Sequence, residues 1–583
     1  MVYRSIRHWI PSLLLLPLTG MMLVNSLGQD SVSAQINNPL PSFPRGPSQP
    51  DTPAPAPSPL PPPDQILPPS APSPLPGENF PSNIPGTIRV KRFDYEGNTA
   101  FSDVELDRVT QQYTNRPISF AELLEARTAV TQLYVNNGYV TSGAYIPPQA
   151  IENGVVKIQI VEGSLEQINV KVEGKLTPSY VRDRIAVASG PPLNVNRLLE
   201  ALQLLQLNPI IKRISAELSA GTRPGTSILD VNVAIADTFT PEAIFDNGRN
   251  PRVGSERRGI QLSDTNLIGF GDNIQAWYLN TEGTDDVDAA YTIPVNPYNG
   301  AVRLEYRNVT AKVIEQPFDQ FDITSDYQKF LLSFRQPILQ TPQQEIAVGL
   351  GFDHQKTQTR LFGVGFPTRG TNNRGRTNIS TLRFFQEATQ RNEQEVLAAR
   401  SEFSVGVDIF DTTEPFDQAV NRFAPGRDYF IWRGQGQWVR LLAPDTLFVI
   451  RSDIQLASNP LVSIEQFSLG GLGNVVGYRQ NYLLTDNGYF GSVEVRLPIY
   501  RARQPDNILQ IVPFATVGGG WNIREAPNPT PGTIASIGLG LQWQYSDYIS
   551  ARIDWGIKLV PIRLEGHTLQ DNGIVFSFIF RPF

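Results

Sequence analysis

The sequence predicts two small α+β modules followed by an all-β transmembrane barrel of about 16 antiparallel strands. Three observations support this fold class. Alternation of apolar and polar residues recurs from about residue 240 to the C-terminus. The two stretches of about 75 residues before it each follow the order strand, helix, helix, strand, strand. After residue 35 no apolar run is long enough for a spanning helix, so membrane insertion would have to use strands.

Residues 1–34 are predicted to be a signal peptide that directs export. Arg4 and Arg7 form a basic start, an apolar run over residues 9–24 follows, and Val32–Ala34 supplies small residues before a cleavage point. A membrane anchor is the alternative interpretation. The apolar run is shorter than the ~20 residues that a bilayer requires, which favours the signal peptide.

Residues 35–86 are predicted to be a proline-rich disordered linker. Runs such as Asp51–Leu60 combine proline, serine and alanine, and this composition cannot bury a core. Such a segment samples extended polyproline II, at ~3.1 Å per residue. A spacer is the simplest interpretation, and recognition by a proline-binding partner is the alternative.

Residues 87–163 form the first predicted module. Ser102 with Glu105, and Ser119 with Glu122, have the spacing at which a hydroxyl and a carboxylate cap the start of a helix. The expected strands lie near Ile88–Tyr95, Tyr139–Tyr145 and Val155–Val161.

Residues 164–236 form the second predicted module, which repeats the plan of the first. Its expected elements are a strand over Leu165–Val172, a helix begun by Thr177-Pro178, a helix with Leu198, Leu202 and Leu205 on one face, and strands near Arg213–Leu218 and Ser227–Ala234.

Residues 237–583 are predicted to form the barrel. Val302, Leu304 and Tyr306 alternate with charged residues, and the same pattern recurs near the C-terminus. A soluble sandwich would also alternate, but its exposed face would carry fewer aromatic residues than these strands do. The predicted C-terminal strand carries aromatic residues at Phe576, Phe578, Phe580 and Phe583.

The composition argues against several classes of function. There are no cysteines, and the three histidines lack the spacing of metal ligands. The net charge of −7 is spread without a basic stripe, which argues against nucleic-acid binding. The glycine-rich runs at Gly269–Asp272 and Gly518–Gly520 lack the remainder of a nucleotide-binding motif. We therefore expect no catalytic residue, no cofactor and no bound metal.

The glycine-dense block over Phe467–Tyr500 resembles a loop signature of two-partner secretion transporters (TpsB), the ShlB/FhaC/HecB hemolysin secretion/activation family within the BamA-like superfamily. The resemblance implies a long loop folded back into the pore, near residues 465–490 and called loop six below. The family tetrapeptide Val-Arg-Gly-Tyr/Phe reads valine, valine, glycine, tyrosine in this chain. The candidate residues of the motif are Gly470, Gly471, Val475, Val476, Gly477, Tyr478 and Arg479.

The family arginine is expected to pair with an aspartate in a strand motif of the form Phe-x-Asp-x-Gly. The matching strand here carries Phe514, Thr516 and Gly518, so Thr516 stands where the aspartate is expected. Both members of the ion pair are therefore absent together. Removing both partners can be nearly neutral, whereas one unpaired buried charge is costly. We interpret the double change as a compensated replacement; the alternative is that Val476 and Thr516 do not face each other.

The two modules resemble POTRA domains in motifs such as Gly97–Phe101, Gly138–Val140 and Leu204–Pro209. The resemblance implies an outer-membrane protein with periplasmic modules that capture a large unfolded exoprotein, adhesin-like or cytolysin-like, for translocation through a monomeric, lipid-embedded barrel. A BamA-type assembly factor and a passive porin are the alternatives. Strand addition at a sheet edge is the expected mode of capture. The candidate edge residues are Val140, Ala144, Ile146, Ile214, Ala216 and Leu218.

Overall fold

The computed structural model describes residues 66–67, 86–415, 425–503, 506–523, 527–562, 566 and 568–582. The predicted signal peptide, the predicted linker apart from Ile66, Leu67 and Gly86, and Phe583 lie outside the described residues.

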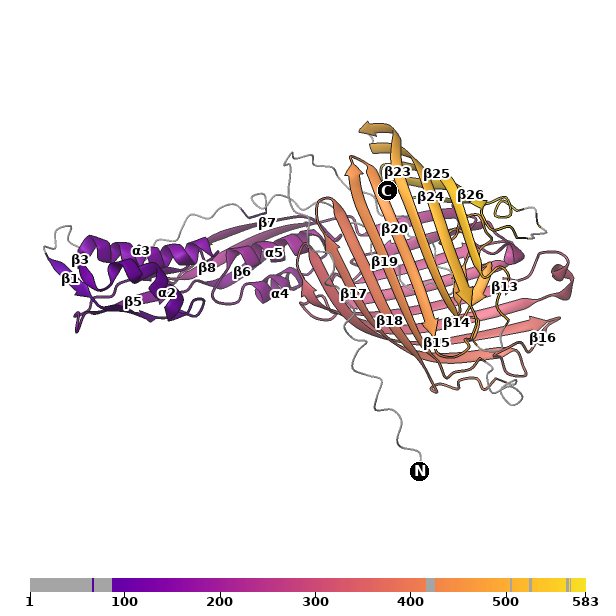
Figure 1. Cartoon of the computed structure of the whole chain (residues 1–583), viewed down its shortest axis with the longest axis horizontal. Helices are drawn as coiled ribbons and strands as arrows, with labels where there is room; N and C mark the ends of the chain where they lie inside the picture. The colour runs from indigo at the N-terminus through magenta and orange to yellow at the C-terminus, as the bar shows by residue number, and fades with distance from the viewer. Residues whose placement is uncertain are drawn as a thin grey trace, which may run out of the picture. The chain divides into compact units, whose positions relative to one another are not determined.

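The first module has two layers, a three-stranded sheet and the helices that cover it. The sheet has the order β2-β5-β4, with β2 parallel and β4 antiparallel to β5, and a separate pair joins β1 to β3. Figure 1 shows these elements in indigo and violet. The elements are β1 (Thr87–Val90), β2 (Arg92–Glu96), α2 (Asp103–Thr110), the 3-10 turn η1 (Gln111–Tyr113), β3 (Arg116–Ser119), α3 (Phe120–Asn136), β4 (Gly143–Tyr145) and β5 (Val155–Val161).

Both predicted capping boxes of the first module are present. The amide of Ser102 donates to Glu105 over 2.8 Å, and that of Ser119 donates to Glu122 over 2.7 Å. The expected strand over residues 88–95 is instead two strands, because residues 87–90 turn away to pair with the unpredicted β3.

Glu162 fastens the loop after β2 to the end of the sheet of the first module. Its carboxylate accepts hydrogen bonds from the amide of Ala100 (2.8 Å), the amide of Thr99 (2.6 Å) and the hydroxyl of Tyr134 (2.8 Å). Burial raises the pKa of Glu162, but these hydrogen bonds outweigh it and hold the pKa below the ordinary value.

The second module follows the predicted plan. Its sheet has the order β6-β8-β7, and α4 and α5 bury Val181, Leu198 and Leu202 against it. The side chain of Asn194 caps α5 by accepting from the amide of Asn196 at 3.0 Å. The elements are β6 (Ser164–Glu173), α4 (Pro178–Ala188), α5 (Val195–Gln206), β7 (Ile211–Ala220) and β8 (Thr226–Ile235).

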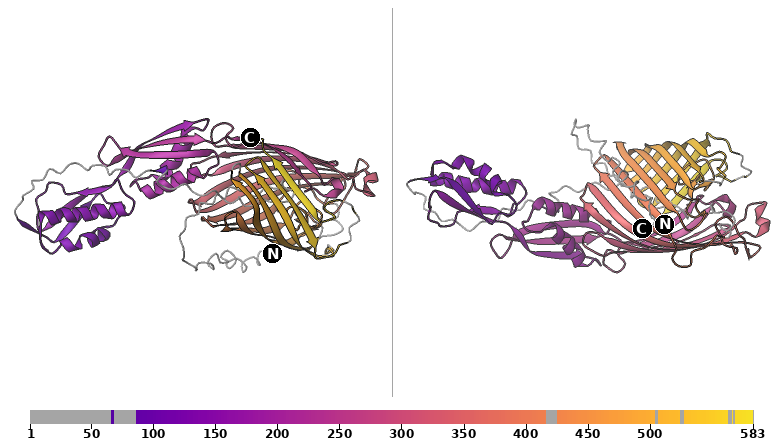
Figure 2. Two further views of the ribbon diagram at one scale, coloured as in Figure 1. Left: turned by 90° about the horizontal axis from the view of Figure 1, so that it is seen from above. Right: turned by 60° about the horizontal axis from the view of Figure 1, so that its bottom comes forward.

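Sixteen antiparallel strands form a closed barrel, which agrees with the predicted number (Figures 1 and 2). The ring closes where β27 pairs with β9, and the two-residue β16 only extends the end of β15. The strands are β9 (Phe239–Asp246), β10 (Arg257–Asp264), β11 (Asn273–Asn280), β12 (Thr284–Pro294), β13 (Ala301–Lys312), β14 (Thr324–Gln340), β15 (Gln344–Leu361), β16 (Val364–Gly365), β17 (Arg376–Arg391), β18 (Glu395–Val407), β19 (Phe430–Ala443), β20 (Thr446–Ala457), β23 (Asn487–Arg503), β24 (Asp506–Trp521), β25 (Thr533–Tyr545), β26 (Ile549–Lys558) and β27 (Ile574–Phe580).

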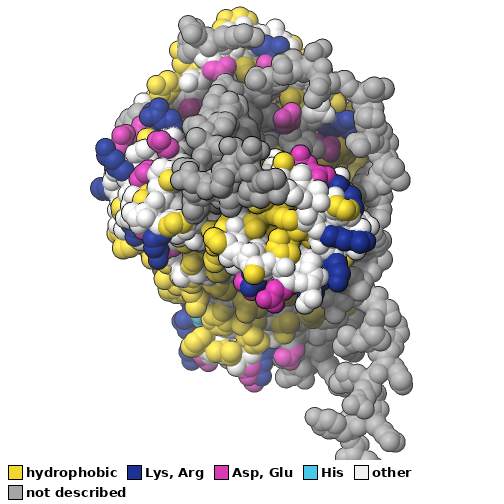
Figure 3. Space-filling view, turned by 90° about the vertical axis from the view of Figure 1, so that its left-hand side faces the viewer, with side chains coloured by type: hydrophobic (Ala, Val, Ile, Leu, Met, Phe, Trp, Pro, Cys, Tyr) yellow, Lys and Arg dark blue, Asp and Glu magenta, His cyan; other side chains and the backbone are white. Residues whose placement is uncertain are grey.

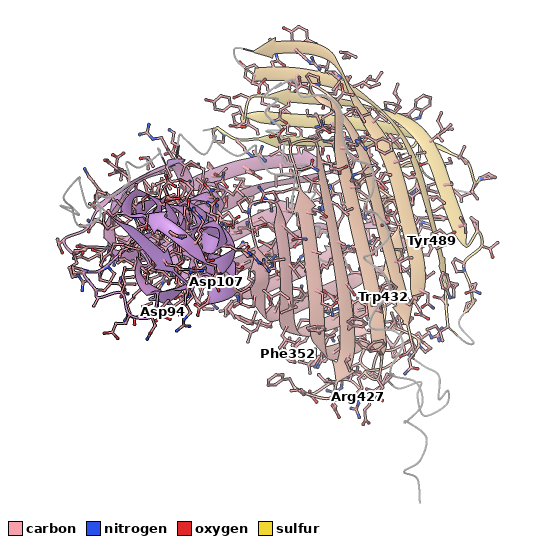
Figure 4. The ribbon with its side chains drawn as sticks, turned by 60° about the vertical axis from the view of Figure 1, so that its left-hand side comes forward. Asp94, Asp107, Phe352, Arg427, Trp432 and Tyr489 are labelled. Carbon is pink, nitrogen blue, oxygen red and sulfur yellow. The ribbon has the colours of Figure 1, made fainter. Side chains whose placement is uncertain are left out.

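The barrel wall is apolar outside and polar inside, as the alternation predicts. Phe352, Trp432 and Tyr489, labelled in Figure 4, pair across strands with the exposed Leu332, Leu456 and Ile454. Hydrophobic side chains gather on the lower surface in Figure 3, which belongs to the barrel. On the C-terminal strand Phe578 and Phe580 are exposed and Phe576 is half-buried. This is the pattern that a lipid-facing wall requires.

The two rims of the barrel differ in the length of their connections. At the rim where β9 begins the connections are short, for example residues 341–343 and 392–394. At the opposite rim most connections are longer, although residues 281–283 form a short one, and the longest is loop six, residues 458–486 between β20 and β23. No helix among the described residues is both long and apolar enough to cross a membrane.

Candidate functional site

Loop six folds back on itself as a short hairpin. β21 (Phe467–Leu469) pairs with β22 (Leu483–Thr485), and the tetrapeptide lies between them. Gly470, Gly471 and Gly477 have φ angles of 105°, 98° and 106°, which other residues rarely adopt. The glycine-dense sequence is thus explained by the tight turns that bring this hairpin together.

The tip of the hairpin is buried against the inner wall of the barrel. Val475 and Tyr478 are fully buried in an apolar cluster with Phe467, Leu469, Leu483 and Ile534. The hydroxyl of Tyr478 lies 2.9 Å from the carbonyl of Ala535 in β25, and it accepts a hydrogen bond of 3.2 Å from the amide of Val560. The tyrosine of the tetrapeptide therefore anchors loop six to β25 and to the connection after β26.

Val476 lies inside the barrel and makes an apolar contact at the position where the motif resemblance led us to expect an arginine. It forms a small buried cluster with Leu472, with Phe514 of β24 and with Val575 of β27. A Cβ added at Gly556 would lie 2.6 Å from the carbonyl oxygen of Val476, so the backbone of the motif rests directly on β26.

Thr516 lines the same small cavity as Val476. The cavity has a volume of about 30 Å³, and the side chains of Phe514, Arg552 and Asp554 also line it. The hydroxyl of Thr516 lies 2.7 Å from that of Ser536, so a hydroxyl pair stands at the position where the motif resemblance led us to expect a carboxylate. Gly518 leaves room for the side chain of Leu469, because a Cβ at position 518 would lie 2.7 Å from it.

Arg479 is the charged anchor of the motif in this chain. Its guanidinium is buried and pairs with Asp571, with one hydrogen bond of 2.9 Å, and with Glu315 at 2.8 Å. Glu315 lies in the connection between β13 and β14, and Asp571 in that between β26 and β27. These partners could not be predicted from the sequence, because neither acid lies in a motif.

A second charged contact holds the base of loop six. Glu465 is buried and pairs with Arg383 of β17 at 2.8 Å, and it accepts a hydrogen bond of 2.8 Å from Gln355 of β15. Arg383 also pairs with Asp353 of β15. Loop six is therefore fastened at its base to β15 and β17, and at its tip to β24, β25 and β26.

Next to the cavity of Val476 and Thr516, the inner wall carries a buried group of charges that we did not predict. Glu494 of β23 pairs with Arg496 at 2.7 Å, with Arg552 at 3.0 Å and with Arg451 at 3.4 Å, while Asp554 pairs with Arg552 at 2.8 Å. These residues alternate with outward apolar residues, so inward charges on neighbouring strands were the available signal. Within the described part of the chain, no group of His, Asp or Glu side chains is arranged to hold a metal ion.

The candidate capture residues lie on edge strands, with two exceptions, Val140 and Ile146, because β4 ends at Tyr145. Val140 precedes β4, which is shorter than expected because residues 139–142 form a turn, with a hydrogen bond of 2.9 Å from Ser142 N to Tyr139 O. Ala144, Ile146, Ile214, Ala216 and Leu218 are all buried. Their side chains face the module cores, so only the backbone of these strands is available along the edges.

A family model decides which proteins this chain is related to. The model described as haemolysin secretion/activation protein ShlB/FhaC/HecB matches residues 225–543, more than half of the chain. The chain belongs to this family. The model of the ShlB-type POTRA domain matches residues 88–163, the first module. The protein is an outer-membrane transporter of the two-partner secretion class, with a periplasmic POTRA region before its barrel.

Relatives and solved structures agree with this family. The outer membrane transporter CdiB of Escherichia coli O6:K15:H31 is 22% identical over 81% of this chain and 79% of its own length. The heme/hemopexin transporter protein HuxB of Haemophilus influenzae (strain 86-028NP) is 21% identical over 68% and 70%. The structure of CdiB from Escherichia coli covers 87% of this chain and 92% of its own, with 20% identity and a TM-score of 0.68.

BamA is a more distant structural neighbour. The structure of BamA from Haemophilus ducreyi lacking POTRA domains 1–3 covers 85% of this chain and 100% of its own, with 12% identity and a TM-score of 0.50. The similarity shows a shared fold. The family model therefore favours secretion over the BamA-type alternative.

Proposed function

We propose that this transporter captures an unfolded exoprotein on the free edge of a module sheet and conducts it through the barrel when loop six leaves its site on the inner wall. The observation that carries the proposal is the burial of the tetrapeptide against β24, β25 and β26. A polypeptide passing through the lumen competes with loop six for this space. The cargo is an adhesin-like or cytolysin-like exoprotein, and one barrel in outer-membrane lipid is the working unit.

The edge of β7 is the better of the two candidate capture edges. The amide of Ala144 in β4 donates to the hydroxyl of Thr131 at 3.0 Å, so this edge donor is already used. In β7 the amide of Ile214 donates to Gln206 at 2.9 Å, and the period of two directs the amides of Ala216 and Leu218 to the same side. An extended cargo segment can pair with these amides, as in other strand additions.

A proline at position 216 tests this edge, because proline removes one edge donor and is tolerated in edge strands. We expect Ala216→Pro to weaken binding of an N-terminal exoprotein fragment to the detergent-solubilised full chain. Glu217→Ala, an exposed side-chain change that keeps every amide, is the matched control. Equal binding by the two variants would exclude β7 as the capture edge.

Deletion of residues 87–236, which removes both modules and with them the proposed capture edge of β7, tests whether the barrel folds without the modules but needs them for export. The barrel closes through its own strand pairs, so we expect a heat-modifiable barrel in the outer membrane that no longer exports a co-expressed exoprotein. Loss of barrel insertion would contradict this reasoning. If this transporter supports insertion of other barrels in cells depleted of their own assembly factor, the BamA-type function is favoured instead.

A further inference from the structure

Two residues of the proline-rich segment are buried in the second module. Ile66 is 1% exposed and Leu67 is 9% exposed, and both belong to the hydrophobic cluster that α4, α5 and the sheet β6-β8-β7 form. They lie more than 100 residues before α4 along the chain. The contact therefore joins a segment outside both modules to the core of the second one.

The sequence around this pair is suited to binding through side chains. Within residues 38–86, Ile66 and Leu67 are the only adjacent pair of large aliphatic residues, and prolines stand at positions 61–63 and 68–69. Proline lacks an amide donor and restricts the backbone, so the flanks cannot extend a sheet ladder. A restricted backbone also loses less conformational entropy when it is held in place.

The second module has a complete fold without this pair. Its own strands and helices follow the same plan as the first module, and Val181, Leu198, Leu202 and Leu229 are fully buried members of its core. Ile66 and Leu67 therefore fill an apolar site on a module whose layers are already formed. A site of this kind can be vacated and filled again.

We propose that Ile66 and Leu67 are an intramolecular ligand of the second module, and that the apolar site they fill is a peptide-binding site for aliphatic pairs in extended chains. Since the proposed function brings an unfolded exoprotein to the modules, such a cargo segment would compete with the pair for this site. The competition rests on that function; the intramolecular binding does not.

The tether sets the strength of this competition. Nineteen residues, 68–86, separate Leu67 from the start of β1. A covalent tether of this length keeps its end near a reachable site, which gives an effective concentration of the order of millimolar. A single weak segment therefore fails to displace the pair, whereas a cargo already held at a module edge succeeds.

Thiol labelling tests the burial directly, since the chain has no cysteine. In the full-length protein in detergent, we expect Leu67→Cys to react with a maleimide at least ~10-fold more slowly than Val104→Cys, because a buried thiol must first be exposed by local opening. Val104 is 62% exposed on α2. Equal rates in the folded protein would overturn the proposal, and equal rates in denaturant are the control.

Binding in trans tests whether the site is a peptide site. A fluorescent peptide of residues 60–72 is expected to bind the full-length Ile66→Asp, Leu67→Asp variant in anisotropy titrations and to bind the wild type at least ~10-fold more weakly, because the tethered pair occupies the site. The peptide with both aspartate substitutions should bind neither protein.

Two further results would overturn this inference. One is absence of peptide binding to the double variant while its second module resists proteolysis as in the wild type. The other is proteolytic loss of residues 164–236 in the double variant, which would make the pair a required part of the core. Neither measurement involves a cargo, so a failure of export in cells would contradict the proposed function and leave this inference intact.

Discussion

Replacement of Arg479 should release loop six from the barrel. Arg479 pairs with two acids, and the exposed fractions of the Arg479 and Asp571 side chains are 10% and 4%. Removing one member of a buried ion pair costs about 3–5 kcal/mol. Asp571 keeps a hydrogen bond of 2.7 Å from Thr568, which places Arg479→Gln at the lower end of this range. A loss of about 3 kcal/mol changes the ratio of docked to undocked loop about a hundredfold.

Conductance in planar bilayers measures this ratio, because undocking of loop six widens the lumen. We expect Arg479→Gln to raise the open fraction by up to the full hundredfold, until it saturates. Arg501→Gln is the matched control, since Arg501 pairs with Asp445 at 2.9 Å in a more exposed place at the other rim. An exposed pair of this kind contributes about 1 kcal/mol or less, so the control should change the open fraction by about fivefold or less.

A double-mutant cycle tests whether Arg479 acts through Asp571. Asp571→Asn alone should also raise the open fraction, and the double variant should open little more than either single variant, because both remove the same interaction. If Arg479→Gln and Arg501→Gln have the same open fraction, Arg479 does not hold loop six. Strict additivity in the cycle would show that its effect does not pass through Asp571.

Three further changes test other contacts. Gly477→Ala should open the channel, because φ at this position is 106° and the new Cβ would lie 2.9 Å from the carbonyl oxygen of Gly556. Gly491→Ala is the control: its Cβ would meet no atom closer than 3.8 Å, so conductance should stay unchanged. Val476→Arg should impair export, and Val476→Arg with Thr516→Asp should recover much of it; a double variant no better than the single one would exclude a coupled pair. The lowered pKa of Glu162 stabilises the first module above the unfolded pKa of ~4.3, and this stability is lost as the pH falls through the lower folded pKa. Urea unfolding, followed by the helical signal in circular dichroism, should show this loss of stability at low pH in the wild type and a much smaller loss in Glu162→Gln.

Periodic features of the fold could be predicted from sequence. The strand pattern predicted sixteen strands and their lipid-facing sides, because a wall between lipid and water forces a period of two. The capping pairs Ser102–Glu105 and Ser119–Glu122 located two helices for a local reason. The strand β3 was missed because it is short and forms only by pairing with residues 87–90.

The partners of loop six could not be predicted, because they depend on how distant loops meet. Asp571 and Glu315 lie 92 and 164 residues from Arg479 in the chain, and no local pattern connects them. The burial of Ile66 and Leu67 could not be predicted for a similar reason. Their proline-rich surroundings indicate a chain without a core of its own, and the core that buries them belongs to another segment.

The charges on the inner wall explain why Val476 and Thr516 should behave asymmetrically. The cavity that both residues line also contains Arg451, Glu494, Arg552 and Asp554. With Arg496, the group has three cations and two anions, all in contact. An arginine at 476 adds a fourth cation without a partner, whereas an aspartate at 516 adds an anion next to an excess of positive charge. Val476→Arg should therefore damage export more than Thr516→Asp does, and the aspartate should rescue the arginine because it restores the balance of charge in a buried site. Equal damage by the two single variants would show that the cavity charges do not govern the docking of loop six.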